Sequence, residues 1–177
     1  NIPENLKEEL YKKIEQTGLK LHLGTKVEKY LDIKVELSNN ETLDYDILLT
    51  SIGITPNIDF LNNELETLDK KILVDEKFRT SVEDVYAIGD CATVYDNSIG
   101  GTNYIALATN AVRSGIVAAH NVCGTKLESI GVQGSNGISI FGLNMVSTGL
   151  TFEKAEKLGI EVLETTFHDL QKPEFME

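Results

Sequence analysis

Apolar and polar residues follow two different periods in the first quarter of the chain. Leu6, Leu10 and Ile14 are four residues apart, which predicts one apolar stripe on a helix. Residues 19–23 are apolar enough for a strand, and from 25 to 43 apolar and polar positions alternate as in a β-meander. We expect this part of the chain to form a solvated face and to carry no chemistry.

Residues 46–52, Asp-Ile-Leu-Leu-Thr-Ser-Ile, form a nearly continuous apolar run. Such a run is typical of a central parallel strand that is buried on both faces. The run stops at Gly53, and open α/β sheets bind their cofactors at the ends of such strands. Gly53 is therefore either a point of cofactor approach or a glycine needed only for the turn at Pro56 and Asn57.

The most informative stretch is residues 80–90, Thr-Ser-Val-Glu-Asp-Val-Tyr-Ala-Ile-Gly-Asp. Residues 85–88 are predicted to form a short buried strand. Gly89 then lets another group approach the backbone closely. Asp90 stands at the carboxyl end of this strand, where its carboxylate can accept hydrogen bonds from a ligand hydroxyl. For an isolated Gly-Asp pair, a strand that simply ends in a turn is the alternative.

A helix is predicted over residues 104–123, behind a loop at 96–103 and ahead of Gly124. Small residues recur along it three or four positions apart, so one face can pack closely: Ala108, Ala111, Gly115 and Ala119. The helix start at 106–109 has few capping side chains, so its free N–H groups can bind an anionic or carbonyl oxygen. A close-packed core helix without a ligand is the alternative interpretation.

The last part of the chain is predicted to contain short elements behind a glycine-rich segment at residues 131–137. That segment is not a dinucleotide fingerprint, because no strand and helix flank it. We expect strands at 138–141, 145–148 and 161–167, and a helix at 152–158 that Thr151 caps.

Composition and charge exclude several classes of function. A hydrophobic content of 41% and a charged content of 25% are ordinary for a globular protein. The net charge of -12 argues against nucleic-acid binding, which needs clustered basic residues. No apolar run approaches the roughly 20 residues that span a bilayer, so we expect no membrane association. Cys91 and Cys123 form no CxxC motif, which favours a reducing cytoplasm, and the three histidines lack metal-ligand spacing.

Four motifs together resemble one family. Residues 80–90 resemble the second flavin motif of flavoprotein reductases with two dinucleotide-binding domains, and residues 50–57 resemble their Gly-x-x-Pro-Asn junction. Residues 131–137 and 146–151 narrow the resemblance within the pyridine nucleotide-disulfide oxidoreductase family. The group indicated is that of NADH oxidases, NADH peroxidases and coenzyme A disulfide reductases, with water-forming NADH oxidases the most similar.

The resemblance implies a fold and a set of cofactor contacts. The fold class is α/β: parts of two Rossmann-like dinucleotide-binding domains, followed by the start of an α+β dimerisation domain. Residues 1–71 would end the NAD-binding domain, 72–127 would form the second segment of the FAD-binding domain, and 128–177 would begin the interface domain. The implied FAD contacts are Asp90 (to the ribityl chain), Leu107, Ala108 and Thr109. The implied NADH neighbours are Gly53, Ala106 and Gly137.

The resemblance also implies an activity for the intact protein. It would oxidise NADH through FAD and reduce dioxygen to water as a cytoplasmic homodimer. The redox cysteine of the family is expected upstream of this chain, so no catalytic residue is assigned within it, and the chain alone is expected to be inactive. The alternatives are peroxide or a disulfide as the electron acceptor, or a non-catalytic nucleotide-binding module.

Overall fold

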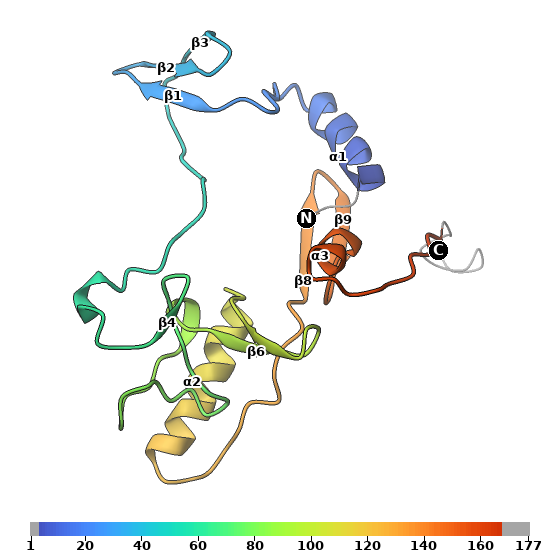
Figure 1. Cartoon of the computed structure of the whole chain (residues 1–177). Coiled ribbons are helices and arrows are strands. Elements are labelled where there is room, and N and C mark those ends of the chain that lie inside the picture. Colours follow the sequence, from blue (N-terminus) through green and yellow to red (C-terminus); the bar gives the residue numbers. More distant parts are fainter. Residues whose placement is uncertain (1–3, 168–177) are drawn as a thin grey trace.

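The structure, a computed structural model, describes residues 4–167 and contains three α-helices, two 3-10 helices and nine short strands within that range (Figure 1). The elements are, in order, α1 (Glu4–Gln16), β1 (Val27–Tyr30), β2 (Lys34–Leu37), β3 (Thr42–Asp44), η1 (Asp59–Leu61), β4 (Thr67–Leu68), β5 (Lys71–Ile72), η2 (Gly89–Cys91), β6 (Val94–Asp96), β7 (Gly101–Asn103), α2 (Ala108–Val122), β8 (Asn136–Ile140), β9 (Leu143–Ser147) and α3 (Phe152–Lys157). No helix among the described residues is both long enough and apolar enough to cross a bilayer.

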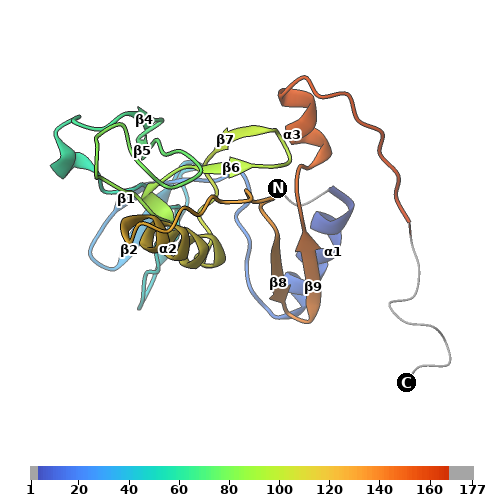
Figure 2. The same ribbon diagram turned by 90° about the horizontal axis from the view of Figure 1, so that it is seen from below.

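The strands form one three-stranded sheet and three separate hairpins. β1, β2 and β3 pair in chain order, and β4–β5, β6–β7 and β8–β9 pair two by two, all antiparallel. Parallel pairing among the described residues is limited to two isolated bridges, Ile72 with Ala92 and Asp96 with Val132. The sheet β1–β3 stands apart from the body formed by β4 to α2, whereas α1 lies beside the β8–β9 hairpin in both views (Figures 1 and 2).

The core lies in the middle of the chain and joins the hairpins to α2. One cluster is centred on Ile72, Ala87 and Ala92, which are all buried. The other is centred on Phe78, Val94 and Ala118, the last of these on the inner face of α2. The two clusters share Val74, so the strands on either side of η2 and the helix that follows form one packed unit.

Several predicted elements are confirmed. α1 carries the expected stripe, with Leu10 buried. The meander is present, and Asn40 in its turn has a φ of 67°. The β8–β9 hairpin is present, and the Thr151 hydroxyl accepts the N–H of Lys154 at 3.3 Å, which caps α3. These elements depend on contacts between residues close in sequence, which is why the local pattern predicts them.

Four predicted strands are wrong. Residues 46–52 form no strand, and Ile47, Leu49 and Ile52 are 80%, 86% and 86% exposed. Residues 19–23 and 161–167 are also unpaired, and residues 85–88 make only one bridge, between Tyr86 and Arg79. A strand needs a neighbouring strand for its backbone hydrogen bonds, and the described chain supplies none beside residues 19–23, 46–52 and 161–167. Residues 85–88 do have a neighbouring segment, because the Thr80 N–H donates to the Val85 carbonyl and the Ala87 N–H donates to the Phe78 carbonyl, but this pairing is too short to form a strand.

Two further expectations need correction. The loop predicted at 96–103 is the β6–β7 hairpin, whose turn residues lie only at its tip. The helix predicted from residue 104 starts at Ala108, because the backbone up to its N-cap Leu107 is extended. Its end is as expected: Gly124 has a φ of 82°, and the N–H of Thr125 donates to the carbonyl of His120.

Candidate functional site

The turn that contains Asp90 is a 3-10 helix, η2, packed against α2. Gly89 has a φ of 72°, a conformation that L side chains rarely adopt, and a Cβ on it would lie 3.7 Å from the Cβ of Ala111. The glycine is therefore needed for the backbone conformation of the turn, whereas the distance to the helix would accommodate a Cβ. Asp90 itself is exposed. Its carboxylate has no hydrogen bond or ion pair within residues 4–167, so it is available to a ligand.

Two side chains that the sequence did not single out hold this turn. The Gly89 N–H donates to Ser114 Oγ at 3.1 Å, and the Tyr104 hydroxyl donates to the carbonyl oxygen of Asp90 at 2.9 Å. Burial raises the pKa of the Tyr104 phenol, and the nearby charges of Asp90 and Cys91 raise that pKa further. Ser114 shares the buried face of α2 with Asn110 and Ala118, and no sequence pattern distinguished its hydroxyl from the other polar side chains of the helix.

The start of α2 is uncapped, as expected. Leu107 is the N-cap residue and no side chain caps the helix there. The N–H groups of Asn110 and Ala111 donate to the Leu107 carbonyl, whereas the N–H groups of Ala108 and Thr109 have no acceptor in the described part of the chain. A helix N-terminus carries about half a positive charge, so these two groups favour a carbonyl or anionic oxygen.

The FAD candidates lie on two elements that are in contact, whereas the NADH candidates lie on three separate segments. η2 contacts α2 at Ala111 and Ser114, immediately after the helix start that carries residues 107–109. In contrast, Gly53 lies on the exposed connection before η1, with a φ of 96° and nothing within 4 Å of its Cβ position. Gly137 lies in β8, and its Cβ position is 3.1 Å from Val146 in β9. Gly53, Ala106 and Gly137 are thus on three separate segments.

A buried carboxylate fixes the hairpin that follows η2. Asp96 is 2% exposed, and it accepts hydrogen bonds from the N–H and hydroxyl of Ser98 and from the Asn103 amide. Burial raises the pKa of the Asp96 carboxyl, but these hydrogen bonds and the charge of Lys154 outweigh burial and leave the pKa below its usual value. Asp96 thereby holds β6 and β7 together, and β7 leads directly to Tyr104.

The two cysteines form no disulfide, and the described chain contains no cluster of metal ligands. Cys91 and Cys123 are free thiols, and Cys91 Sγ donates to the Ile88 carbonyl at 3.3 Å. No group of three His, Cys, Asp or Glu side chains within residues 4–167 is placed to hold a metal ion.

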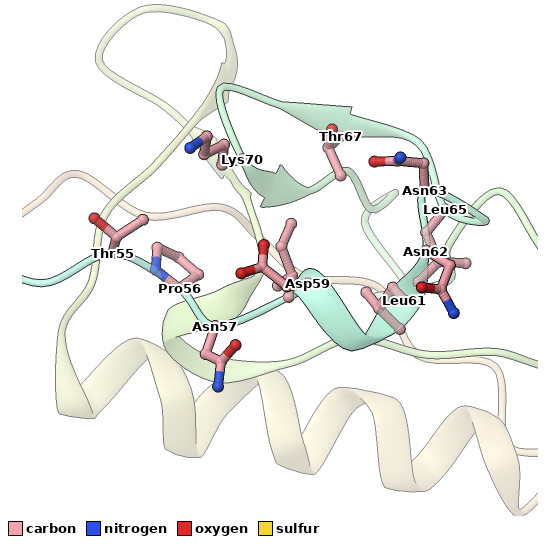
Figure 3. A pocket seen from close by; sticks show the side chains of 11 residues that line it. Thr55, Pro56, Asn57, Asp59, Leu61, Asn62, Asn63, Leu65, Thr67 and Lys70 are labelled. Carbon is pink, nitrogen blue, oxygen red and sulfur yellow. The ribbon is translucent and has the colours of Figure 1, made fainter.

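A separate pocket lies between η1 and the β4–β5 hairpin (Figure 3). Thr67 and Lys70 of the hairpin line one wall, and Asn57 and Asp59 line the other. None of the candidate cofactor residues lines this pocket, although Pro56 and Asn57 of the predicted turn do. The pocket is therefore distinct from the η2 turn, and nothing in the sequence pattern indicated it.

Comparisons with known proteins match most of the chain. Residues 1–115 match the family described as pyridine nucleotide-disulphide oxidoreductase. An NADH oxidase from Streptococcus pneumoniae serotype 4 is 53% identical over 169 residues, which are 93% of this chain and 37% of that protein. An NADH oxidase from Lactococcus lactis subsp. cremoris is 47% identical over 167 residues, 91% of this chain and again 37% of that protein.

A solved structure agrees with these matches. The water-forming NADH oxidase from Lactobacillus brevis, bound to NADH, superposes on 98% of this chain and 40% of its own, with a TM-score of 0.92 and 30% identity. This likeness confirms the α/β fold class. The chain covers only part of the fold of that structure. The chain spans about 37% of the length of the curated relatives that it matches. It belongs to the pyridine nucleotide-disulphide oxidoreductase family.

Proposed function

We propose that this chain is the flavin-facing part of a FAD-dependent NADH oxidase that reduces dioxygen to water. The observation that carries the proposal is the exposed Asp90 on a turn packed beside the uncapped start of α2. The names of the relatives support the activity, and the Lactobacillus brevis protein, described as water-forming, supports the product.

The residues present fit a flavin dinucleotide. A free carboxylate suits the hydroxyls of a ribityl chain, and two N–H groups at a helix start suit the carbonyl oxygens of a flavin ring. We assign Asp90, Leu107, Ala108 and Thr109 to FAD, and Gly53, Ala106 and Gly137 to NADH. Bound FAD would supply the electron transfer between NADH and dioxygen, while these residues bind and orient it.

The proposal extends to the organisation of the whole protein. Residues 1–71 would belong to the NAD-binding domain, 72–127 to the FAD-binding domain and 128–177 to the dimerisation domain. The redox cysteine would lie in a preceding segment of the full-length protein, which would work as a cytoplasmic homodimer. Peroxide and disulfide remain the competing electron acceptors, and the experiment below separates them from dioxygen.

The test is the ratio of NADH to dioxygen consumed by the full-length protein that contains this chain. Four electrons reduce dioxygen to water and each NADH delivers two, so we expect about two NADH per dioxygen and no accumulated peroxide. NADH absorbance and an oxygen electrode, read in the same cuvette, give this ratio. A ratio near one with peroxide released would contradict the water-forming reaction, and turnover only with added peroxide or coenzyme A disulfide would contradict the oxidase.

A further inference from the structure

We propose that Tyr104 and Ser114 are positioning residues that hold the backbone of Asp90 in the place from which its carboxylate can bind FAD. The inference rests on the proposed function, because it takes Asp90 as a FAD ligand. It adds to that function two residues that affect FAD binding through the η2 turn and need not touch FAD.

Tyr104 holds the turn from the side of the β6–β7 hairpin. Its hydroxyl donates to the carbonyl oxygen of Asp90 itself, at 2.9 Å. The ring is held in turn by Lys71 of β5, whose Nζ lies 5.1 Å from the ring centroid in a cation–π contact. A tyrosine hydroxyl is protonated at neutral pH and is therefore a donor, and burial raises the pKa of this phenol further. Tyr104 thus links Asp90 to a strand that is distant in sequence.

Ser114 holds the turn from the side of α2. Its side chain is 2% exposed, its hydroxyl donates to the Ala111 carbonyl at 2.8 Å, and its oxygen accepts the Gly89 N–H at 3.1 Å. The donated bond fixes the direction of the hydroxyl, which leaves a lone pair of the oxygen for Gly89. Ser114 therefore ties the turn to the helix whose start carries the other FAD candidates.

Together the two residues fix the backbone on both sides of Asp90. Ser114 binds the N–H of the preceding residue, and Tyr104 binds the carbonyl of Asp90. The Asp90 carboxylate makes no hydrogen bond of its own within residues 4–167, so the place from which it can reach a ligand depends on this backbone. A backbone that is fixed in advance loses less freedom when the side chain binds a ligand, which increases the affinity.

The test compares FAD dissociation constants of the full-length holoprotein and its variants. Tyr104→Phe removes the hydroxyl but keeps the ring against Lys71, and we expect the dissociation constant to rise roughly three- to tenfold, the worth of one ordinary hydrogen bond. Tyr95→Phe is the matched control, because the Tyr95 hydroxyl has no hydrogen-bond partner in the described chain, and we expect no change. Ser114→Ala should raise the dissociation constant by a similar factor. Its control is Ser139→Ala, at an exposed serine, for which we expect no change.

A double-mutant cycle separates positioning from a general effect on the fold. If Tyr104 acts through Asp90, Tyr104→Phe should raise the dissociation constant no further once Asp90 is alanine. Additive effects in the cycle, or an unchanged constant in Tyr104→Phe and Ser114→Ala while Asp90→Ala weakens binding, would overturn the positioning role. An unchanged constant in Asp90→Ala itself would instead overturn the assignment of Asp90 to FAD, and the inference with it.

Discussion

Expressed alone, the 177-residue chain is expected to purify without colour, to self-associate and to oxidise no NADH. One carboxylate and one helix start are too few contacts to offset the cost of immobilising a large dinucleotide. Large apolar side chains are exposed along the chain, among them Ile47, Leu49 and Ile52 on the unpaired segment before η1. Such surfaces promote association. Flavin absorbance, size-exclusion chromatography with light scattering and an NADH assay in air measure the three properties.

A matched variant shows whether the unpaired segment causes the association. Ile47→Ser, Leu49→Ser and Ile52→Ser, combined, remove its three most exposed apolar side chains and should shift the chain toward monomer. The isolated chain should stay colourless and inactive in this variant as well. A yellow, monomeric preparation of the unmodified chain that consumes NADH would contradict this expectation and show that these residues suffice for the activity.

In the full-length protein, Ala106→Glu is expected to lower the reduction potential of the flavin and to slow its reduction by NADH. Ala106 immediately precedes the N-cap residue of α2, and the flavin gains negative charge when it is reduced. For an assumed separation of about 8–10 Å between this charge and the flavin, the repulsion is roughly 2 kcal/mol at an effective dielectric constant of about 20. For a two-electron couple, this corresponds to roughly 40 mV. An anaerobic redox titration and stopped-flow reduction by NADH measure the two effects.

The control for this substitution is Ala106→Gln, which has nearly the same shape without the charge. We expect its potential to stay close to that of the unmodified protein, so that the shift in Ala106→Glu is attributable to charge. Equal potentials in the glutamate and glutamine variants, with FAD still bound, would show that the start of α2 is remote from the flavin.

The parts of the fold that the sequence predicted are those whose contacts are local. The stripe of α1, the β1–β3 meander and the Thr151 cap each involve residues close together in the chain. Residues 46–52 and 161–167 have the composition of strands and yet are unpaired. Strand propensity reflects the fit to a half-buried sheet, so it is not realised where the described chain offers no neighbouring strand.

In the candidate site, too, the features formed by local contacts could be predicted and those formed by distant contacts could not. The exposed Asp90 turn and the uncapped start of α2 follow from residues adjacent in sequence. The side chains that hold the turn could not be predicted, because Tyr104 reaches Asp90 across 14 positions and Ser114 reaches Gly89 across 25. Contacts at such separations depend on how β6, β7 and α2 pack, and no local period encodes that packing.

In the full-length protein, we expect FAD to lie against Asp90 and the start of α2. A crystal structure of that protein with bound FAD should place an Asp90 carboxylate oxygen within about 3 Å of a ribityl hydroxyl, a hydrogen-bond distance. The N–H groups at the start of α2 should face the carbonyl edge of the flavin ring. An Asp90 carboxylate turned to solvent, or a flavin ring remote from the start of α2, would contradict this position of FAD.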